Sequence, residues 1–179
     1  MPLWPLLTSL SFCLRYIRLE KFVLMISNRV ITYVWFSLCA CICQVSGARF
    51  WKLFQQLCIT PENFFRRCFV HNMCPLLFMC LSGKNLTPAD LPADARRQLN
   101  TACDRALVDA VRLLGVRTVV AVGKYTQCRA RAALHIAAIT DVDVVTILHP
   151  SPASPAANRA WSDIALAQLT QAGLLKYLQ

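Results

Sequence analysis

Acidic residues are scarce in this chain, which has 9 Asp plus Glu against 19 Lys plus Arg among its 179 residues and a formal charge of +10. Such an excess suits a polyanionic partner, either a nucleic acid or an anionic membrane surface. No basic run is longer than the pairs Arg66-Arg67 and Arg96-Arg97, so no basic tail identifies the partner. A basic, solvated surface is an equally good interpretation.

The ten cysteines lack the C-x-x-C spacing of many zinc sites. The alternating cysteines of residues 39–43 offer poor geometry for one tetrahedral ion. One set has the residue types of a zinc site: Cys58, Cys68, His71 and Cys74. Two of these positions fall in apolar runs, where cysteine acts as a small buried hydrophobe. We therefore expect neither a metal nor another cofactor.

The amino terminus has no basic n-region, with which a secretory signal would begin. Residues 1–48 are hydrophobic and rich in cysteine, and Val30–Val45 is slightly short for a membrane span. Three interpretations stay open: a membrane anchor within residues 22–45, an extension that docks on the domain, or a stretch that does not fold. Ser46-Gly47-Ala48 marks the boundary, and we expect one domain over residues 49–179.

Beyond residue 48 the order of the expected elements indicates an α/β fold. Helical spacing and capping residues predict helices over residues 50–57, 61–65, 92–114, 126–138 and 155–172, and apolar runs predict strands over 68–70, 117–122 and 142–148. This alternation of strands and helices favours parallel strands with helices on both faces. At least one more strand is expected. The apolar residues 76–81 could form another buried stretch, but residues 1–48 do not obviously supply a strand.

The last predicted strand runs directly into His149 and the proline-rich Pro150-Ser151-Pro152. Ligands of open α/β sheets bind beyond the carboxyl ends of the strands. Prolines restrict the backbone, so this loop can hold one imidazole in place or enter another molecule at little entropic cost. The alternative is a tight strand-to-helix connection in which the histidine is incidental.

Asn72 follows the first of the predicted parallel strands and could face His149 across the sheet edge. Its amide offers a donor and an acceptor side by side, which match O4 and N3–H of uracil. Cytosine presents the opposite order and would leave buried groups unpaired. A histidine across the pocket could donate to O2 of a departing pyrimidine as negative charge develops there. Taken alone, Asn72 is more often a turn or capping residue.

Several linked motifs resemble the single-strand-selective monofunctional uracil-DNA glycosylases. They are Phe69–Leu76, Gly83–Pro92, Leu113–Arg117, Val120–Gly123 and Leu148–Pro152, with Asn158 and Trp161. The similarity covers roughly residues 49–179, in order and without large gaps. It implies a three-layer α/β/α fold with a small parallel sheet, and a target base that is flipped out of the DNA.

The resemblance also assigns roles to single residues. Asn72 stands where the family reads uracil, and His149 stands where the family stabilises the leaving uracil. The segment Pro150–Asn158 matches the part that enters the DNA and holds the gap open. The DNA contacts that we expect are Pro150, Ser151, Pro152, Ser154, Asn158, Arg159, Lys84 and Lys124.

The chain departs from the family in two places. The family's first strand and its Gly-Met-Asn-Pro-like loop, whose asparagine positions the attacking water, should precede residue 49. No Asn-Pro occurs in the chain, so this strand and loop are missing from the predicted fold. Ala153 stands where the family usually has a basic residue and Ser154 where it has asparagine, which removes a DNA contact.

We therefore predict a nuclear, monomeric base-excision repair glycosylase that hydrolyses the N-glycosidic bond of uracil and related damaged pyrimidines. Its partners are single- and double-stranded DNA containing uracil, with water as the nucleophile. The missing loop leaves a second hypothesis, a catalytically impaired DNA-binding remnant or truncated product. A third hypothesis, less favoured, is a membrane-anchored protein held by residues 22–45.

Overall fold

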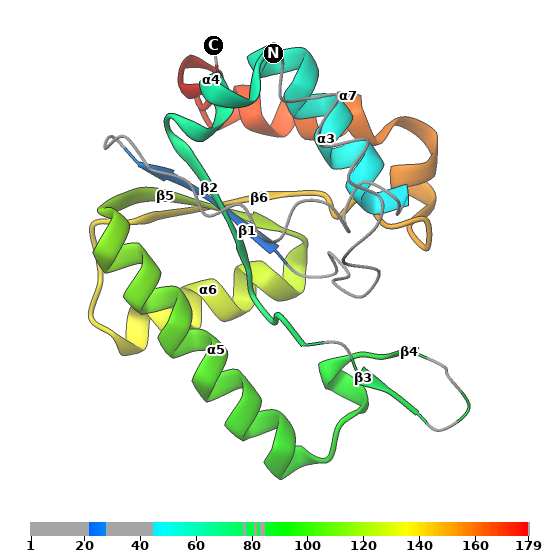
Figure 1. Ribbon diagram of the computed structural model, residues 1–179, viewed down its shortest axis with the longest axis vertical. Helices are drawn as coiled ribbons and strands as arrows, with labels where there is room; N and C mark the ends of the chain where they lie inside the picture. The colour runs from blue at the N-terminus through cyan, green and yellow to red at the C-terminus, as the bar shows by residue number, and fades with distance from the viewer. Residues whose placement is uncertain (1–21, 28–44, 77, 81, 83–84, 179) are drawn as a thin grey trace.

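The computed structural model describes residues 22–27, 45–76, 78–80, 82 and 85–178, and it places a four-stranded sheet between two layers of helices (Figure 1). The sheet has the order β2-β1-β5-β6 and consists of β1 (Phe22–Ser27), β2 (Cys68–Asn72), β5 (Val116–Val122) and β6 (Asp143–Ile147). The predicted three-layer α/β fold is thereby confirmed.

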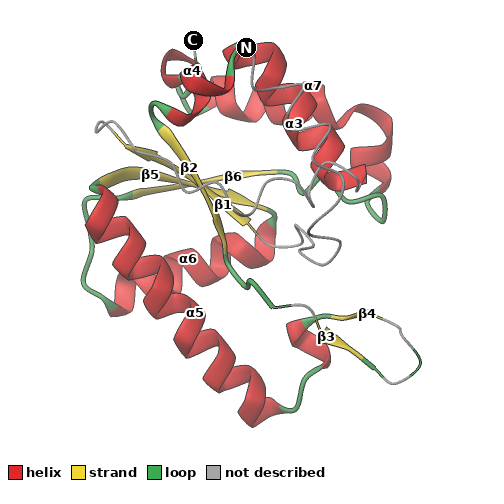
Figure 2. Ribbon diagram, viewed as in Figure 1, coloured by secondary structure: helices red, strands yellow, loops and turns green. Residues whose placement is uncertain are grey.

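The helices cover the two faces of the sheet separately, as Figure 2 shows. One face carries α3 (Val45–Cys58), α4 (Pro61–Phe65) and α7 (Pro155–Gln171), and the other carries α5 (Ala93–Leu114) and α6 (Lys124–Ile136). Short elements complete the described chain: the hairpin β3 (Phe78–Met79) and β4 (Asn85–Leu86), and the 3-10 turns Pro88–Asp90 and Leu175–Tyr177.

The ends of the helices follow from local sequence. Thr60 accepts a hydrogen bond from the Asn63 N–H at the start of α4, and Ser154 accepts one from the Ala157 N–H at the start of α7. Each of these helices begins with a proline, whose fixed φ suits the first turn. Gly115 ends α5 with a positive φ of 58°, as expected for a glycine after a helix.

Two hydrophobic clusters hold the layers together. Under α3, α4 and α7, the rings of Phe50, Phe54 and Phe64 pack with centroids 4.5 and 5.1 Å apart, against the buried Val120 and Ile147 of the sheet. Under α5 and α6, the core residues of the opposite face are Met25, Leu107, Val111, Val119 and Leu134. The sheet is therefore buried on both faces over its central strands.

The strand β1 is the main difference from the sequence-based expectation. It pairs antiparallel with both β2 and β5, whereas β5 and β6 are parallel. The strands β2, β5 and β6 consequently share one direction, as predicted, and β1 runs against them. Residues 1–48 do supply a strand, because the apolar run around the fully buried Met25 fills the gap between β2 and β5.

Other boundaries also differ from the predictions. The strand β2 is two residues longer than expected and includes Asn72. The expected buried stretch 76–81 is wrong, because Leu76 is 59% and Met79 54% exposed beside a two-residue strand. The helix α6 begins at Lys124, where Gly123 is the capping residue in place of Thr126.

The described residues bear on the third hypothesis only in part. Of the proposed anchor 22–45, residues 22–27 are the strand β1, and residues 28–44 lie outside the described residues. Within the described part of the chain, none of the helices combines the length and the apolar character that a membrane crossing requires.

Replacing Met25 by alanine tests whether β1 is a structural strand. Met25 is 0% exposed, and truncation of a buried methionine to alanine costs about 2–5 kcal/mol. We expect this loss in the free energy of unfolding, measured by urea titration. Leu113→Ala is the matched control, because Leu113 is 79% exposed and its truncation should change stability by less than about 0.5 kcal/mol. Equal midpoints for the two variants would contradict the placement of β1.

Candidate functional site

The carboxyl ends of β2, β5 and β6 meet at one edge of the sheet. Asn72 is the last residue of β2, Gly123 follows the end of β5, and His149 comes two residues after the end of β6. Because β1 and β5 lie between β2 and β6, the backbones that carry Asn72 and His149 are three strand spacings apart, which is about 14 Å. The structure therefore brings the two predicted site residues to the same edge.

The register also fixes the face toward which Asn72 points. His71, Val23, Ala121 and Thr146 form one row across the sheet. Neighbouring residues of a strand point to opposite faces, so Asn72 shares the other face with Val122 and Ile147. Val122 and Ile147 belong to the cluster under α3 and α7. The Asn72 side chain therefore points to the face of the sheet that α3 and α7 cover. The loop after His149 leads into α7 on this same face.

Asn72 carries a buried polar atom without a partner. Its side-chain Oδ1 is inaccessible to solvent and accepts no hydrogen bond. An unpaired buried acceptor costs about 1–3 kcal/mol, which a ligand donor would recover. The alternative role of Asn72 as a turn or capping residue is not supported, since that role would use this oxygen.

His149 is half-buried and packs against the end of β5. Gly123 has a φ of +93°, and a Cβ at that position would lie 3.1 Å from Cβ and 3.4 Å from Cδ2 of His149. The Gly123 N–H donates to the carbonyl of Ile147 at 2.9 Å. Gly123 therefore forms part of the surface against which the imidazole packs. We did not predict this role from the sequence, although Gly123 ends the motif Val120–Gly123.

Helix α7 fixes the chain directly before His149. The backbone N–H of Leu148 donates to Gln168 Oε1 at 2.8 Å, and the indole Nε1 of the buried Trp161 donates to the Leu148 carbonyl at 2.7 Å. Side chains of the same helix thus bond both the backbone N–H and the backbone carbonyl of Leu148. This arrangement leaves His149 at the start of a loop whose origin is rigid.

The loop Pro150–Asn158, as we call the segment that ends with the first four residues of α7, has its own internal hydrogen bonds. The Ser154 N–H donates to the Ser151 carbonyl at 3.1 Å, and Ser151 Oγ accepts from the Ala153 N–H at 3.1 Å. Pro150 is buried, whereas Pro152 and Asn158 are exposed. A further contact from α3 was missed by sequence reasoning: Arg49 donates to the Pro150 carbonyl and to Asn158 Oδ1.

The remaining predicted DNA contacts are scattered or not described. Lys124 is the first residue of α6 and is exposed beside Gly123, and Arg159 is exposed in the first turn of α7. Lys84 lies outside the described residues. The structure thus places Lys124 at the same sheet edge as His149, and Arg159 at the end of the loop.

The residues considered for zinc do not gather. Burial raises the pKa of the Cys58 thiol to about 12 and that of the Cys68 thiol further still, so both remain protonated. Cys68 belongs to the cluster under α3, whereas His71 points to the opposite face of the sheet. Among the described residues no group of three or more His, Cys, Asp or Glu side chains could hold a metal ion.

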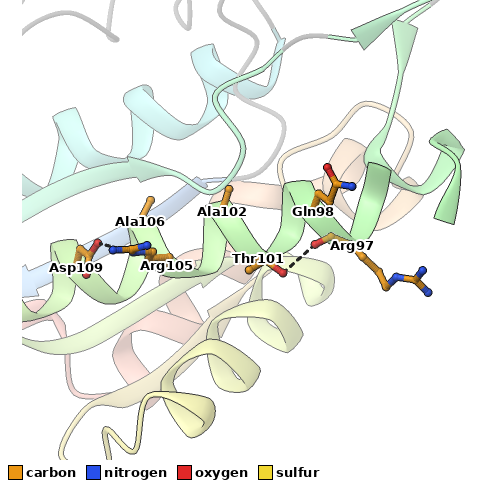
Figure 3. A pocket seen from close by; sticks show the side chains of 7 residues that line it. All are labelled: Arg97, Gln98, Thr101, Ala102, Arg105, Ala106 and Asp109. Carbon is orange, nitrogen blue, oxygen red and sulfur yellow. Dashed lines mark hydrogen bonds and ion pairs between the residues drawn. The ribbon is translucent and has the colours of Figure 1, made fainter. Parts of the chain in front are cut away.

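A surface hollow of about 620 Å³ lies elsewhere, along α5 (Figure 3). The residues that line it are Arg97, Gln98, Thr101, Ala102, Arg105, Ala106 and Asp109. They all belong to one helix, and polar groups bond along it, as Thr101 does to the Arg97 carbonyl. The hollow contains none of the residues at the sheet edge.

The chain is similar to one well-defined family. The model of the uracil DNA glycosylase superfamily matches residues 22–170. The single-strand selective monofunctional uracil-DNA glycosylase of Rattus norvegicus is 57% identical over 136 residues, which are 75% of this chain and 48% of the relative. The proteins of that name from Bos taurus and Mus musculus are 54% and 55% identical, again over 75% of this chain and 49% and 48% of the relatives. The chain spans about half the length of these curated relatives.

Gly123→Ala tests the seat of His149. Its backbone conformation is nearly restricted to glycine, and such strain costs about 1–3 kcal/mol, to which the contact with His149 adds. Gly173→Ala is the matched control, because Gly173 also has a positive φ but no atom within 4 Å of its added Cβ. We expect only Gly123→Ala to shift the imidazole NMR signals of His149. Unchanged signals would show that Gly123 does not position the ring.

His71 makes the stability of the protein depend on pH. Burial lowers the pKa of His71 below 6.5, and its Nε2 has no hydrogen-bond partner. Below pH 6.5 the unfolded chain binds more protons at this residue than the folded protein does, so the free energy of unfolding decreases as the pH falls toward the folded pKa.

The measurement is urea unfolding between about pH 5.5 and 8, the range in which histidine titrates. His71→Gln should remove most of the decrease, whereas His135→Gln, at an exposed position of α6, should retain it. If both variants keep the slope of the unaltered protein, His71 is not its cause.

Proposed function

Because the chain belongs to the uracil-DNA glycosylase superfamily, we propose that it binds uracil-containing DNA and hydrolyses the N-glycosidic bond of an extruded uracil, a step of base-excision repair. The observation that carries this proposal is the buried, unpaired Oδ1 of Asn72 at the sheet edge that also holds His149. The names of the relatives, which specify uracil-DNA glycosylases with single-strand selectivity, support the substrate.

Asn72 supplies the base recognition. Its Oδ1 accepts the N3–H of uracil and its amide group donates to O4. Cytosine has an acceptor at N3 and a donor at the exocyclic amine, so both contacts would become repulsive and stay buried. The selectivity for uracil therefore depends on an amide that has no other partner for its oxygen.

His149 stabilises the leaving group. When the bond between C1′ of the deoxyribose and N1 of uracil breaks, the electron pair passes to the base and charge develops on O2. A donor from the imidazole, held by Gly123 and the loop, meets that charge. Water adds to C1′ and gives up a proton, and the departing uracil anion takes up one proton from solvent, so the products are free uracil and an abasic site.

The loop Pro150–Asn158 enters the DNA in this proposal. Flipping a base out of a stack costs a few kcal/mol, and a preorganised wedge offsets part of that cost by occupying the gap. The exposed Lys124 and Arg159 bind phosphates beside it. A nuclear site of action, a monomeric state, and the use of single- and double-stranded DNA belong to the same proposal; cell fractionation and sedimentation test the first two.

A second candidate function is binding of uracil-containing DNA with little release of the base. The direction of β1 favours it. Ile26 pairs with Cys68 at the start of β2, and Ser27 pairs with Val116 at the start of β5, so β1 ends at the edge opposite Asn72 and His149. In the family that this chain resembles, the loop after the first strand positions water. The strand β1 therefore ends at the wrong edge of the sheet for a loop with that task.

Release of uracil from a single-stranded oligonucleotide decides between the two functions. We expect release by the unaltered chain, and a decrease of about 10²–10³-fold for His149→Leu, because a leaving-group donor is lost. Asn72→Ala should abolish the preference for uracil over cytosine in binding. If release by the unaltered chain equals that of His149→Leu while uracil-dependent binding persists, the second function holds and the glycosylase proposal fails.

A further inference from the structure

One side chain ties the loop Pro150–Asn158 to helix α3. Arg49 Nη1 donates to the backbone carbonyl of Pro150 at 3.2 Å, and Arg49 Nη2 donates to Oδ1 of Asn158 at 2.9 Å. Asn158 Nδ2 in turn donates to the carbonyl of Pro152 at 2.7 Å. A single guanidinium therefore holds both ends of the loop, and its partners lie 101 and 109 residues away in the sequence.

The base of this attachment is rigid. Arg49 directly precedes Phe50, which is 0% exposed and whose ring lies 5.1 Å from that of Trp51 and 4.5 Å from that of Phe54. The backbone of Arg49 is thus fixed to the core that also contains Ile147, two residues before His149. Arg49 consequently fixes the loop relative to the imidazole of His149.

The helix α7 packs this segment into the core at Ala157 only, so the exposed part of the loop depends on a further attachment. The first turn of α7 is separated from the remainder by Ala160, whose φ of −157° and ψ of 50° are not helical. Ala157 is buried in the core under α3, and the well-packed remainder of the helix begins with Trp161, whereas residues 151–156 are half-buried or exposed. The bonds of Ser151 and Ser154 define the shape of the loop, but they lie within it and do not join it to the protein.

The chemistry of the contact requires a guanidinium. Its partners are neutral oxygens on two different groups, which a planar fork can meet together and a lysine ammonium cannot meet in the same geometry. The ion pairs among the described residues are made by other arginines, so no carboxylate neutralises Arg49 there. Its positive charge therefore strengthens the two hydrogen bonds to neutral oxygens.

We propose that Arg49 is a positioning residue that holds the Pro150–Asn158 loop in the conformation that enters DNA. The proposal rests on the proposed function for its link to DNA. Arg49 does not touch the base or the reacting atoms; it acts through the loop. Its effect is therefore largest on substrates in which a stacked base must be displaced, and smallest where the base is already unstacked.

The experiment compares Arg49→Met and Arg49→Lys with Lys52→Met, a matched variant that removes a charge from an exposed position one turn along α3. Dissociation constants are measured for a duplex with one U·G pair and for a single strand with one uracil. We expect both Arg49 variants to weaken duplex binding about tenfold, as for the loss of hydrogen bonds to a charged group, and single-strand binding by much less. Lys52→Met should weaken the binding of both substrates slightly and by the same factor.

Two outcomes overturn the proposal. Duplex binding restored by Arg49→Lys would mean that charge alone matters, so that Arg49 is a phosphate contact. An equal loss of affinity for the duplex and the single strand in Arg49→Met would likewise mean that Arg49 is a phosphate contact. Urea unfolding of each variant accompanies the binding data, because a positioning role leaves the free energy of unfolding nearly unchanged for these half-buried or exposed side chains.

Hydrogen exchange of the free protein separates this proposal from the proposed function. In Arg49→Met the amides of Ser154 and Ala157, which are bonded within the loop, should exchange at least about tenfold faster, since local opening becomes easier. Unchanged exchange would refute the attachment whether or not the chain binds DNA. Faster exchange in a protein that does not discriminate uracil would instead refute the proposed function and retain the attachment.

Discussion

The common direction of β2, β5 and β6 is the constraint on which the candidate site depends. Only strands that run the same way can bring their carboxyl ends, and with them Asn72, Gly123 and His149, to one edge of a sheet. The direction is set by helical crossovers on the α5 and α6 side, and the free edge is left for loops. Within the described part of the chain, β2 reaches the others only through β1, which has the opposite direction and contributes no residue to the site from its carboxyl end.

The site itself is assembled by the sheet together with the helix layer of α3 and α7. Helix α7 holds both backbone groups of Leu148, β5 supports the imidazole with a residue that has no side chain, and α3 reaches the loop with an arginine. Each contact is short and made by a different element. Preorganisation of this kind reduces the ordering cost when a ligand arrives, which is what the proposed entry of the loop into DNA requires.

The sequence was sufficient for the parts in which local pattern and tertiary structure agree. Runs of β-branched residues indicated β5 and β6, and the ends of the predicted strands 68–70 and 142–148 placed Asn72 and His149 at one edge of the sheet. The strand β1 escaped because its six residues lie in a hydrophobic amino-terminal stretch that fitted an anchor or an extension equally well, and periodicity carries no information on direction. Arg49 escaped because its partners lie more than a hundred residues away, where no local rule applies.

The position of β1 has a consequence for cooperativity. Transient melting of this one strand would break the pairing of β2 with the sheet and displace the Asn72 amide, while β5 and β6 stayed paired and kept the His149 imidazole in place. The position of the Asn72 amide relative to the His149 imidazole is thus governed by the opening free energy of a six-residue segment, however stable the rest of the molecule is.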